Sequence, residues 1–161
     1  MYRLGLFLFA ITIFFFSCKS VEKTRTTSSA YLKFDVEYIK QISEGVVCYK
    51  IYVQGDSKKE CIQLAKLNLI KTILFTGIQT APNPRPLVPE VNALEKYKNY
   101  FNAFLSSNGG YLEFIKLYNG GKISDNDRLQ TGDRKLYGIE LEVSLTKLLN
   151  TLENSNIIPK K

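Results

Sequence analysis

The sequence contains no histidine and no tryptophan, and only 3 of its 161 residues are cysteine. Without histidine, Ser-His and Cys-His nucleophilic pairs and histidine-ligated metal sites are excluded. A glycine-rich phosphate loop is also missing, because Gly120 and Gly121 lack the lysine and serine or threonine arrangement of that motif. We therefore expect no cofactor-binding, metal-binding or catalytic residues, and an enzyme built from this chain would depend on carboxylates or a tyrosine alone.

Charge is scarce in the first part of the chain. After Arg3, positions 4–16 carry no charged residue, and the small residue Ser17 then precedes Cys18. A charged start, an apolar core of about 7–15 residues and a small-residue cleavage site are typical of a secretory signal. A membrane-spanning helix needs about 20 apolar residues, and Lys19 comes too soon for that. The pattern predicts a signal peptide over positions 1–17, with an uncleaved anchor or cleavage without lipidation as the alternatives.

The end of this segment resembles the lipobox of bacterial lipoproteins. The matching residues are Phe15, Phe16, Ser17 and Cys18, although the two phenylalanines differ from the aliphatic or small residues usual there. The resemblance implies cleavage after Ser17 and attachment of diacylglycerol and an acyl chain such as palmitate to Cys18. Two or three acyl chains hold a protein on a membrane effectively permanently, because each buried methylene contributes about 0.8 kcal/mol.

The residues after Cys18 bear on the location. Lys19 differs from the aspartate that marks inner-membrane retention in the lipoproteins this segment resembles, so the outer membrane is favoured. Among the four residues that follow Cys18, only Glu22 is acidic. The acidic cluster that resembles a signal for surface display is therefore absent, and we expect the domain to face the periplasm. Positions 18–30 are rich in hydroxyl residues and carry too little apolar area to order themselves, which predicts a lipidated cysteine followed by a flexible tether.

The net charge is +7, and the signal contains only one charged residue, Arg3. A basic domain held at a membrane favours contact with anionic headgroups, peptidoglycan or acidic glycans, while a solvated basic surface is the simpler interpretation. The expected partners are membrane lipid through acylated Cys18 and an envelope protein or anionic envelope polymer. Nucleic acid is disfavoured by the compartment.

Positions 31–161 predict a single α+β domain, an antiparallel sheet of about three to four strands with two to three helices packed on it. Apolar residues alternate over positions 31–38, 46–54 and 136–145, which is the period of half-buried strands. The first two runs read as a hairpin whose second strand is central, because both of its faces are largely apolar. The apolar faces of strands and helices should form one core, made of Val47, Ile51, Ile139 and Leu141 from the strands and Leu69, Ile73, Phe101 and Phe104 from the helices.

Helical spacing occurs in four further places. Ser57 and Glu60 form a capping box for a helix that runs to about Thr76, with Gly77 as its C-terminal cap. A second helix is predicted over positions 92–107, with Leu94 and the aromatic residues on its buried face. We also predict helix over 111–118, and a final helix capped by Thr146.

Two long loops separate these elements. Ala81 to Pro89 holds four prolines and predicts a stiff connector, with a polyproline docking site as the alternative. Asn119 to Lys135 is rich in small polar residues and predicts a loop or flap. Asp125, Asp127 and Asp133 lie in it, but Leu129 and the missing closing glutamate disfavour a calcium loop.

Cys48 and Cys61 are expected to stay unbridged. Cys48 lies about seven residues before the end of its strand, or ~23 Å at ~3.3 Å per residue. Cys61 lies in the first turns of the following helix. Such a separation exceeds the ~7 Å limit between the α-carbons of a disulfide.

Glu140 and Glu142 share one face of the last strand, but no third catalytic partner is visible beside them. The order of strand, capped helix and late strand over positions 46–149 is similar to small envelope lipoproteins of the LPP20 type, which implies an accessory envelope role. Our first hypothesis is a lipid-anchored, non-catalytic binding or assembly module. The alternatives are a hydrolase of envelope glycans that uses Glu140 or Glu142, and a periplasmic inhibitor or immunity-like module that presents one of the two loops.

Overall fold

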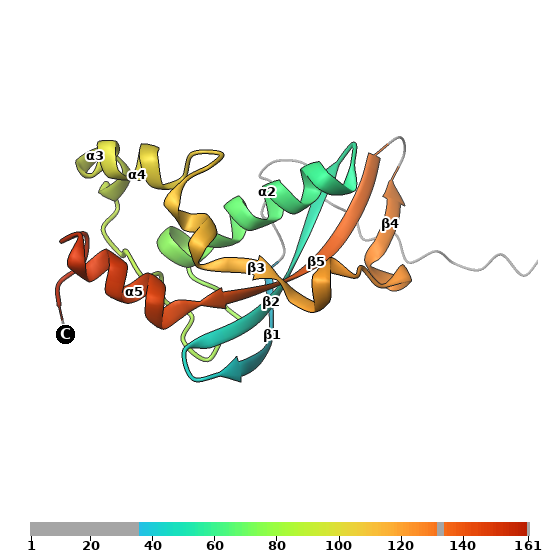
Figure 1. Cartoon of the computed structure of the whole chain (residues 1–161), viewed down its shortest axis with the longest axis horizontal. Helices are drawn as coiled ribbons and strands as arrows, with labels where there is room; N and C mark the ends of the chain where they lie inside the picture. Colours follow the sequence, from blue (N-terminus) through green and yellow to red (C-terminus); the bar gives the residue numbers. More distant parts are fainter. Residues whose placement is uncertain (1–35, 132–133, 161) are drawn as a thin grey trace, which may run out of the picture. The chain divides into compact units, whose positions relative to one another are not determined.

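The computed structural model describes residues 36–131 and 134–160, without the side chains of 129–134. The contacts divide the chain into two units, Met1–Leu32 and Lys33–Lys161, and every described residue belongs to the second. The predicted signal, the lipobox and the tether therefore lie outside the described residues. The second unit is an α+β domain, which confirms the predicted fold class (Figure 1).

The sheet is antiparallel throughout. Its strands follow the order β1-β2-β5-β3, and β4 pairs with β5 beside β3. Their bounds are β1 Val36–Ser43, β2 Val46–Gly55, β3 Ile115–Leu117, β4 Arg128–Thr131 and β5 Arg134–Ser144. The predicted hairpin and the last predicted strand thus belong to one sheet, in which β2 pairs with β5.

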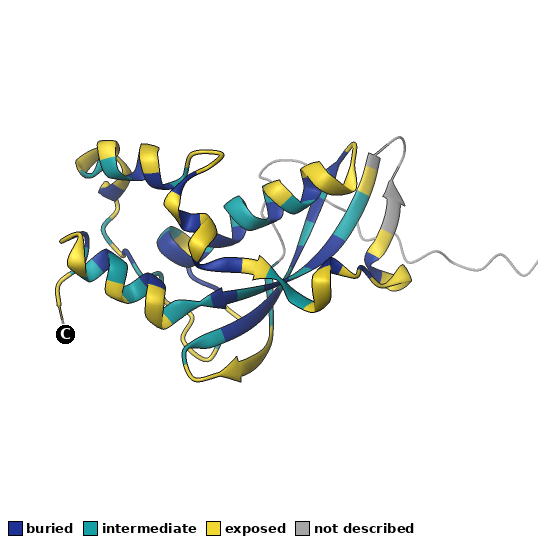
Figure 2. Ribbon diagram, viewed as in Figure 1, coloured by how far each residue is buried: buried dark blue, intermediate teal, exposed yellow. Residues whose placement is uncertain are grey.

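The predicted hairpin is confirmed. β1 and β2 pair with Tyr38 opposite Tyr49, and the turn between them uses Gly45 at φ +68°. The register slips at Ile39 and at Ile42, so β1 carries two bulges on the edge of the sheet. β2 is central between β1 and β5, and β1 is largely exposed (Figure 2).

The first predicted helix is confirmed as α2 (Lys58–Lys71), which continues into one wider π-helical turn, η1 (Thr72–Thr76). The Ser57 side chain accepts a hydrogen bond from the Glu60 backbone N–H at 3.2 Å, and the Glu60 carboxylate accepts one from the Asp56 N–H at 3.0 Å. The first contact satisfies a helix N–H group that has no partner within the helix, and the second joins the residue before the cap to the first turn. Gly77, at φ +78°, follows the last turn, as predicted.

The second predicted helix is two short ones, α3 (Ala93–Lys96) and α4 (Lys98–Phe104), separated at Tyr97. Phe101 and Phe104 are buried as expected, whereas Leu94 is 52% exposed. The prediction for Leu94 was therefore wrong. A single helical stripe would have buried it with the aromatic residues, but the break at Tyr97 turns α3 onto a different face.

The helix predicted over 111–118 was also wrong. A short 3-10 turn, η2 (Gly110–Glu113), leads directly into strand β3. The predicted loop from Asn119 to Lys135 contains two further 3-10 turns, η3 (Tyr118–Gly121) and η4 (Asp125–Asp127), and all of strand β4. β3 and β4 are too short to show the alternation of a strand, so pairing with β5 determines them.

The last helix, α5 (Leu145–Asn154), begins one residue after β5 ends. Its N-cap is Ser144, so the prediction of a cap at Thr146 was wrong. Thr146 instead lies against the hairpin turn, where its backbone N–H donates to the Gly45 carbonyl at 3.4 Å. The tertiary contact thus sets the start of the helix.

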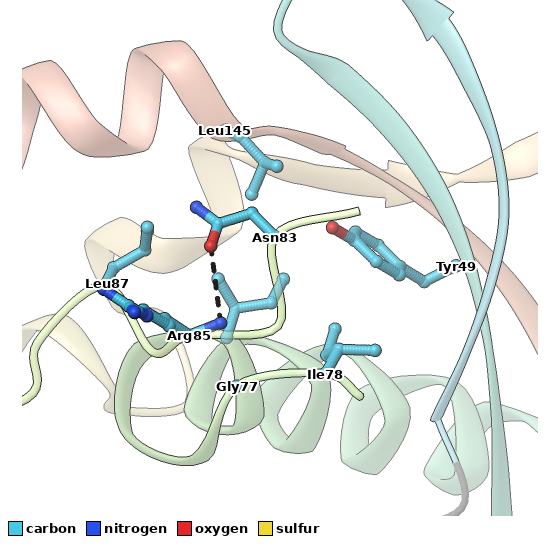
Figure 3. A pocket seen from close by; sticks show the side chains of 8 residues that line it. Tyr49, Gly77, Ile78, Asn83, Arg85, Leu87 and Leu145 are labelled. Atoms are coloured by element: carbon cyan, nitrogen blue, oxygen red, sulfur yellow. Dashed lines mark hydrogen bonds between the residues drawn. The ribbon is translucent and has the colours of Figure 1, made fainter. Parts of the chain in front are cut away.

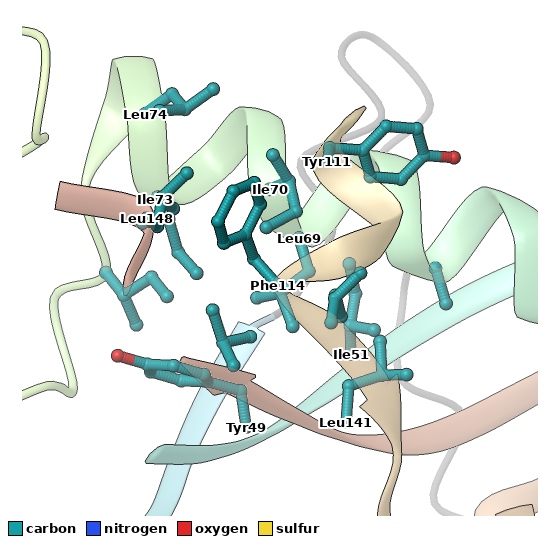
Figure 4. Close-up of a cluster of buried hydrophobic side chains, with 14 of the residues drawn as sticks. Tyr49, Ile51, Leu69, Ile70, Ile73, Leu74, Tyr111, Phe114, Leu141 and Leu148 are labelled. Atoms are coloured by element: carbon teal, nitrogen blue, oxygen red, sulfur yellow. The ribbon is translucent and has the colours of Figure 1, made fainter. Parts of the chain in front are cut away.

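One core lies between the sheet and the helices. In Figure 4, Leu69, Ile70 and Ile73 of the α2 and η1 segment extend toward Tyr49, Ile51 and Leu141 of the strands. Every residue predicted for a shared core is buried in it: Val47, Ile51, Leu69, Ile73, Phe101, Phe104, Ile139 and Leu141. The opposite face of the sheet is left for a different set of side chains.

Candidate binding site at a break in the sheet edge

The outer edge of β5 is covered by two separate strands. β3 pairs with β5 from Leu141 to Val143, and β4 pairs with it from Arg134 to Tyr137. Between these two pairings, positions 138–140 of β5 have a strand partner only on the β2 side, because the chain leaves the outer edge after β3 and returns only at Arg128. The segment between the two strands, positions 118–127, contains η3 and η4, and we call it the excursion. Beside it lies a polar hollow of about 440 Å³.

We call this space the hollow and define it by the residues that line it: Asn119, Lys122, Ile123, Ser124, Asp125, Asp127, Arg128, Gly138 and Glu140. Three of these residues are acidic and two are basic. The hollow therefore presents both signs of charge within one recess, together with the amide of Asn119 and the hydroxyl of Ser124.

Lys50 of β2 lies beside the hollow and contacts two of the carboxyl groups that line it. Its Nζ lies 3.0 Å from Asp127 Oδ2, 3.1 Å from Asp127 Oδ1 and 3.3 Å from Glu140 Oε1. The Tyr52 hydroxyl donates to Asp127 Oδ1 at 3.3 Å. Asp127 is only 9% exposed, so its charge is removed from water and balanced by Lys50.

The electrostatics keep Lys50 charged. Burial lowers its pKa, but hydrogen bonds to Asp127 and Glu140 raise it, and the net pKa lies above the ordinary lysine value. Burial, followed by the nearby carboxylates of Glu37 and Asp127, raises the pKa of Tyr52. A lysine ammonium and a phenol that donates a hydrogen bond therefore lie behind the Asp127 and Glu140 side chains of the hollow.

Gly138 makes room for this network. A Cβ at this position would lie 2.8 Å from Tyr52 Cε1 and 2.9 Å from Asp127 Cβ, closer than real Cβ contacts. Any side chain here would push Tyr52 and Asp127 apart. The glycine in the middle of β5 is thus explained by the close approach of the η4 segment to the sheet.

The excursion is held in shape by its own contacts. Asn119, Gly120 and Gly121 all have positive φ, at 48°, 65° and 75°, so the chain turns through three consecutive left-handed residues. Farther along, Arg128 donates to the Ile123 carbonyl at 3.1 Å and pairs with Asp125 at 3.3 Å. The rim of the hollow is therefore braced on both sides.

The two glutamates proposed from the sequence lie on one sheet face but in different ion pairs. Glu140 pairs with Lys50, and Glu142 pairs with Lys116 at 2.9 Å. In a glycoside hydrolase, the space between two carboxyl groups receives the scissile bond and water. Here the Lys50 ammonium lies within hydrogen-bonding reach of both Asp127 and Glu140 and occupies that space.

Of the three aspartates considered for calcium, Asp125 and Asp127 both line the hollow, and the side chain of Asp133 lies outside the described part of the chain. Asp127 directs both oxygens at Lys50, so an ammonium group takes the place that a cation would need. Among the described residues, no group of three potential metal ligands is found.

The sequence did not reveal Lys50, Tyr52 and Asp127 as a group. Lys50 and Asp127 are 77 positions apart, and pairing between such distant residues cannot be read from one sequence. A signal was nevertheless present. β2 was expected to be central, and a lysine on a central strand requires a partner when its head is removed from water.

The cysteines behave as predicted, because Cys48 and Cys61 are both free and buried. Cys48 lies on the polar side of the sheet. Burial, and then the charge of Glu140, raise its pKa to about 11. A thiol of this kind is protonated at neutral pH and a poor nucleophile. The predicted lipidation site Cys18 and cleavage site Ser17 lie outside the described residues.

Comparisons with protein-family models, with curated proteins and with solved structures found no match for this chain. Among the helices between positions 36 and 160, none combines the length and the apolar character that crossing a membrane requires.

Proposed function

We propose that this protein is a lipid-anchored component of the bacterial cell envelope whose domain binds another envelope protein in the hollow. The anchor part rests on the lipobox-like sequence that ends at Cys18. Positions 19–35 lie between that cysteine and β1. Fully extended at about 3.3–3.6 Å per residue, such a segment would let the domain reach roughly 60 Å from the membrane surface.

The observation that carries the binding part is the arrangement around Lys50. The carboxylates of Asp127 and Glu140 are already engaged by its ammonium, and the rim is braced by Arg128. A recess whose polar groups are fixed in advance loses little entropy when a partner enters, which favours recognition. The same engagement leaves no open space between the carboxylates for hydrolytic chemistry.

The charge of the hollow favours a protein over an anionic polymer. Asp125, Asp127 and Glu140 offset the charges of Lys50 and Arg128, with which they pair, so the hollow has little excess positive charge to attract phosphate or sugar-acid groups, whereas Lys122 offers a site for an acidic side chain. A polar protein segment that carries both signs of charge complements such a recess. The inhibitor-like alternative presents this same Asn119 to Lys135 region, so both ideas place the contact here.

The anchor is tested with Cys18→Ala in the full chain. We expect the variant to remain unprocessed and to incorporate no radiolabelled palmitate, because no other residue of the lipobox-like segment offers a thiol. Wild-type protein should incorporate the label, and Cys61→Ala, which removes a buried thiol, serves as the control that should keep it. Equal labelling of the wild type and Cys18→Ala would refute the anchor.

Binding in the hollow is tested by photocrosslinking in cells. A photoreactive amino acid replaces Lys122, an exposed residue on the rim, and in a matched chain it replaces Lys98, an exposed lysine on α4. We expect a discrete protein adduct from position 122 that is missing from position 98. The same adducts from both positions, or none from position 122, would contradict the proposal.

A further inference from the structure

The break in the outer edge of β5 presents backbone groups as well as side chains. β3 and β4 lie beside different parts of β5 (Figure 1), and positions 138–140 pair only with β2. Gly138 lines the hollow although it has no side chain, so its backbone atoms border that space. The hollow is therefore bounded on one side by a short stretch of strand edge that no other strand covers.

The direction of these backbone groups follows from a hydrogen bond farther along β5. The Ser144 N–H donates to the Phe114 carbonyl at 2.9 Å, next to β3, and so points away from β2. β5 pairs with β2 in an unbroken register, and the backbone groups along such a strand point alternately to its two edges. Gly138 and Glu140 have even positions like Ser144, so their N–H and C=O groups point into the break.

A contact at the other edge of the sheet agrees with this alternation. Tyr38 lies opposite Tyr49, and its N–H donates to the Thr80 side chain at 2.9 Å, away from β2. Tyr49 and Ile51 must then direct their backbone groups toward β5, where Ile51 lies opposite Ile139. Position 139 therefore uses its backbone groups within the sheet, and its neighbours on both sides direct theirs outward.

No described residue of the chain takes the open positions. Among the backbone hydrogen bonds found outside the helices and strands of residues 36–131 and 134–160, none reaches Gly138 or Glu140. A longer β3 would pair there, but Asn119 and Gly120 have positive φ values of 48° and 65° and turn the chain away. Gly138 is buried, and a buried N–H or C=O without a partner lowers stability. A segment that continued the ladder would supply the missing partners.

A second, smaller cavity lacks this feature. It has a volume of about 50 Å³ and is lined by side chains that include Tyr49 and Leu87 (Figure 3). The proline-rich loop, positions 81–89, lies beside it, and the Leu87 N–H donates to the Ile73 carbonyl at 3.0 Å. β2 is paired on both edges at Tyr49, so this cavity offers a ligand no free strand backbone.

We propose that the partner in the hollow binds as an extended segment, which adds a short strand to β5 between β3 and β4. This inference rests on the proposed function and specifies the form that the partner takes there. Two residues that point outward exchange up to four backbone hydrogen bonds with one antiparallel strand. Three positions of a strand extend about 10 Å at ~3.3 Å per residue, which sets the length of the paired part.

Lys122 adds a requirement for a side chain of this segment. It is exposed on the rim of the hollow, and no carboxylate among the described residues lies within ion-pairing distance of it. Arg128 pairs with Asp125 and Lys50 with Asp127, so those charges are already balanced. An extended segment that carries an acidic side chain complements the site. A helix does not, because its N–H and C=O groups bond within the helix.

The first test is hydrogen exchange, resolved by residue, in the full chain in detergent micelles. The amides of Gly138 and Glu140 should exchange at least about tenfold faster than those of Ile139 and Leu141, which bond to β2. In the purified position-122 adduct, the two fast amides should slow to the rates of their neighbours. Equal rates for all four amides in the free protein would overturn the proposal. Unchanged rates in the adduct would overturn the added strand but leave binding in the hollow intact.

The second test separates the backbone of Glu140 from its side chain. Glu140→Ala and Glu140→Pro both lose the carboxylate that pairs with Lys50, but only proline also lacks the N–H. Proline is accepted at a strand edge whose N–H lies outside the ladder, so both variants should fold. With the photoreactive residue at position 122 and equal amounts of folded protein, the adduct yield should be at least about tenfold lower for Glu140→Pro than for Glu140→Ala.

The outcomes distinguish the two levels of the account. Equal adduct yields from Glu140→Ala and Glu140→Pro would overturn the added strand while the proposed function stands. The absence of the adduct from all chains, including the one with Glu140 intact, would overturn the proposed function and this inference with it. The exchange rates decide the matter even if Glu140→Pro fails to fold, because they are measured without that substitution.

Discussion

The two faces of the central strand pair differ in chemistry although the same residues of β2 and β5 supply both by alternation. On one face, Tyr49, Ile51 and Leu141 are buried beneath α2. On the other, Lys50 joins Glu140 of the neighbouring strand to Asp127 of the excursion. The first face holds the fold together, and the second forms the wall of a recess. The two faces can therefore be perturbed separately.

The largest effect is expected on the apolar face. Leu69 is fully buried, so Leu69→Ala should lower the free energy of unfolding by about 2–5 kcal/mol through lost burial and a residual cavity. The matched control is Leu94→Ala, because Leu94 is 52% exposed; that change should stay within about 0.5 kcal/mol. Urea denaturation of the full chain measures both. Equal effects at the two positions would mean that the core is misplaced.

A smaller effect is expected on the polar face. Lys50→Met would leave Asp127 and Glu140 facing one another without the ammonium, and should cost about 1–3 kcal/mol, since the site keeps some contact with water. Lys116→Met removes a lysine whose side chain is 74% exposed and should change stability by less than about 0.5 kcal/mol. The same denaturation experiment compares them, and a larger loss for Lys116→Met would reverse the ranking proposed here.

The smallest effect is expected in the pH dependence of stability, through the buried Cys48 thiol on the polar side of the sheet. Burial raises the pKa of Cys48 from 9.0 to about 11, so above pH 9 the unfolded chain loses this proton more readily than the folded one. The stability contributed by Cys48 is thus complete below pH 9 and is lost as the pH rises toward 11. Cys48→Ala should flatten the fall in stability over that window. Denaturation midpoints at pH 8, 9, 10 and 11 check it, and parallel curves for variant and wild type would contradict the buried thiol.

Those parts of the fold that depend on local pattern could be predicted from the sequence. Alternation along β2 identified its buried face, and the Ser57 and Glu60 spacing located the start of α2. Both signals arise from neighbours in the chain. The shared core followed from them, because an apolar strand face and an apolar helix face must cover one another.

The remaining elements depend on distant partners. β3 has only three residues and becomes a strand because β5 offers it an edge. The Thr146 cap failed because the hairpin turn at Gly45 engages that residue. The ion pair between Lys50 and Asp127 joins residues that are 77 positions apart. The proline-rich loop lies against η1 through backbone hydrogen bonds from Leu87 and Val88. None of these contacts leaves a periodic trace in the sequence.

The measurement that tests the central claim most directly is the yield of the position-122 adduct in an Asp127→Asn background. This change keeps the shape of the side chain and leaves Lys50 paired with Glu140, but it removes one charge from the wall of the hollow. At equal amounts of folded protein, we predict that the yield falls about tenfold. Glu113→Gln, whose ion pair with Lys147 at 3.8 Å lies outside the hollow, should leave it intact. An unchanged yield in Asp127→Asn would contradict the account.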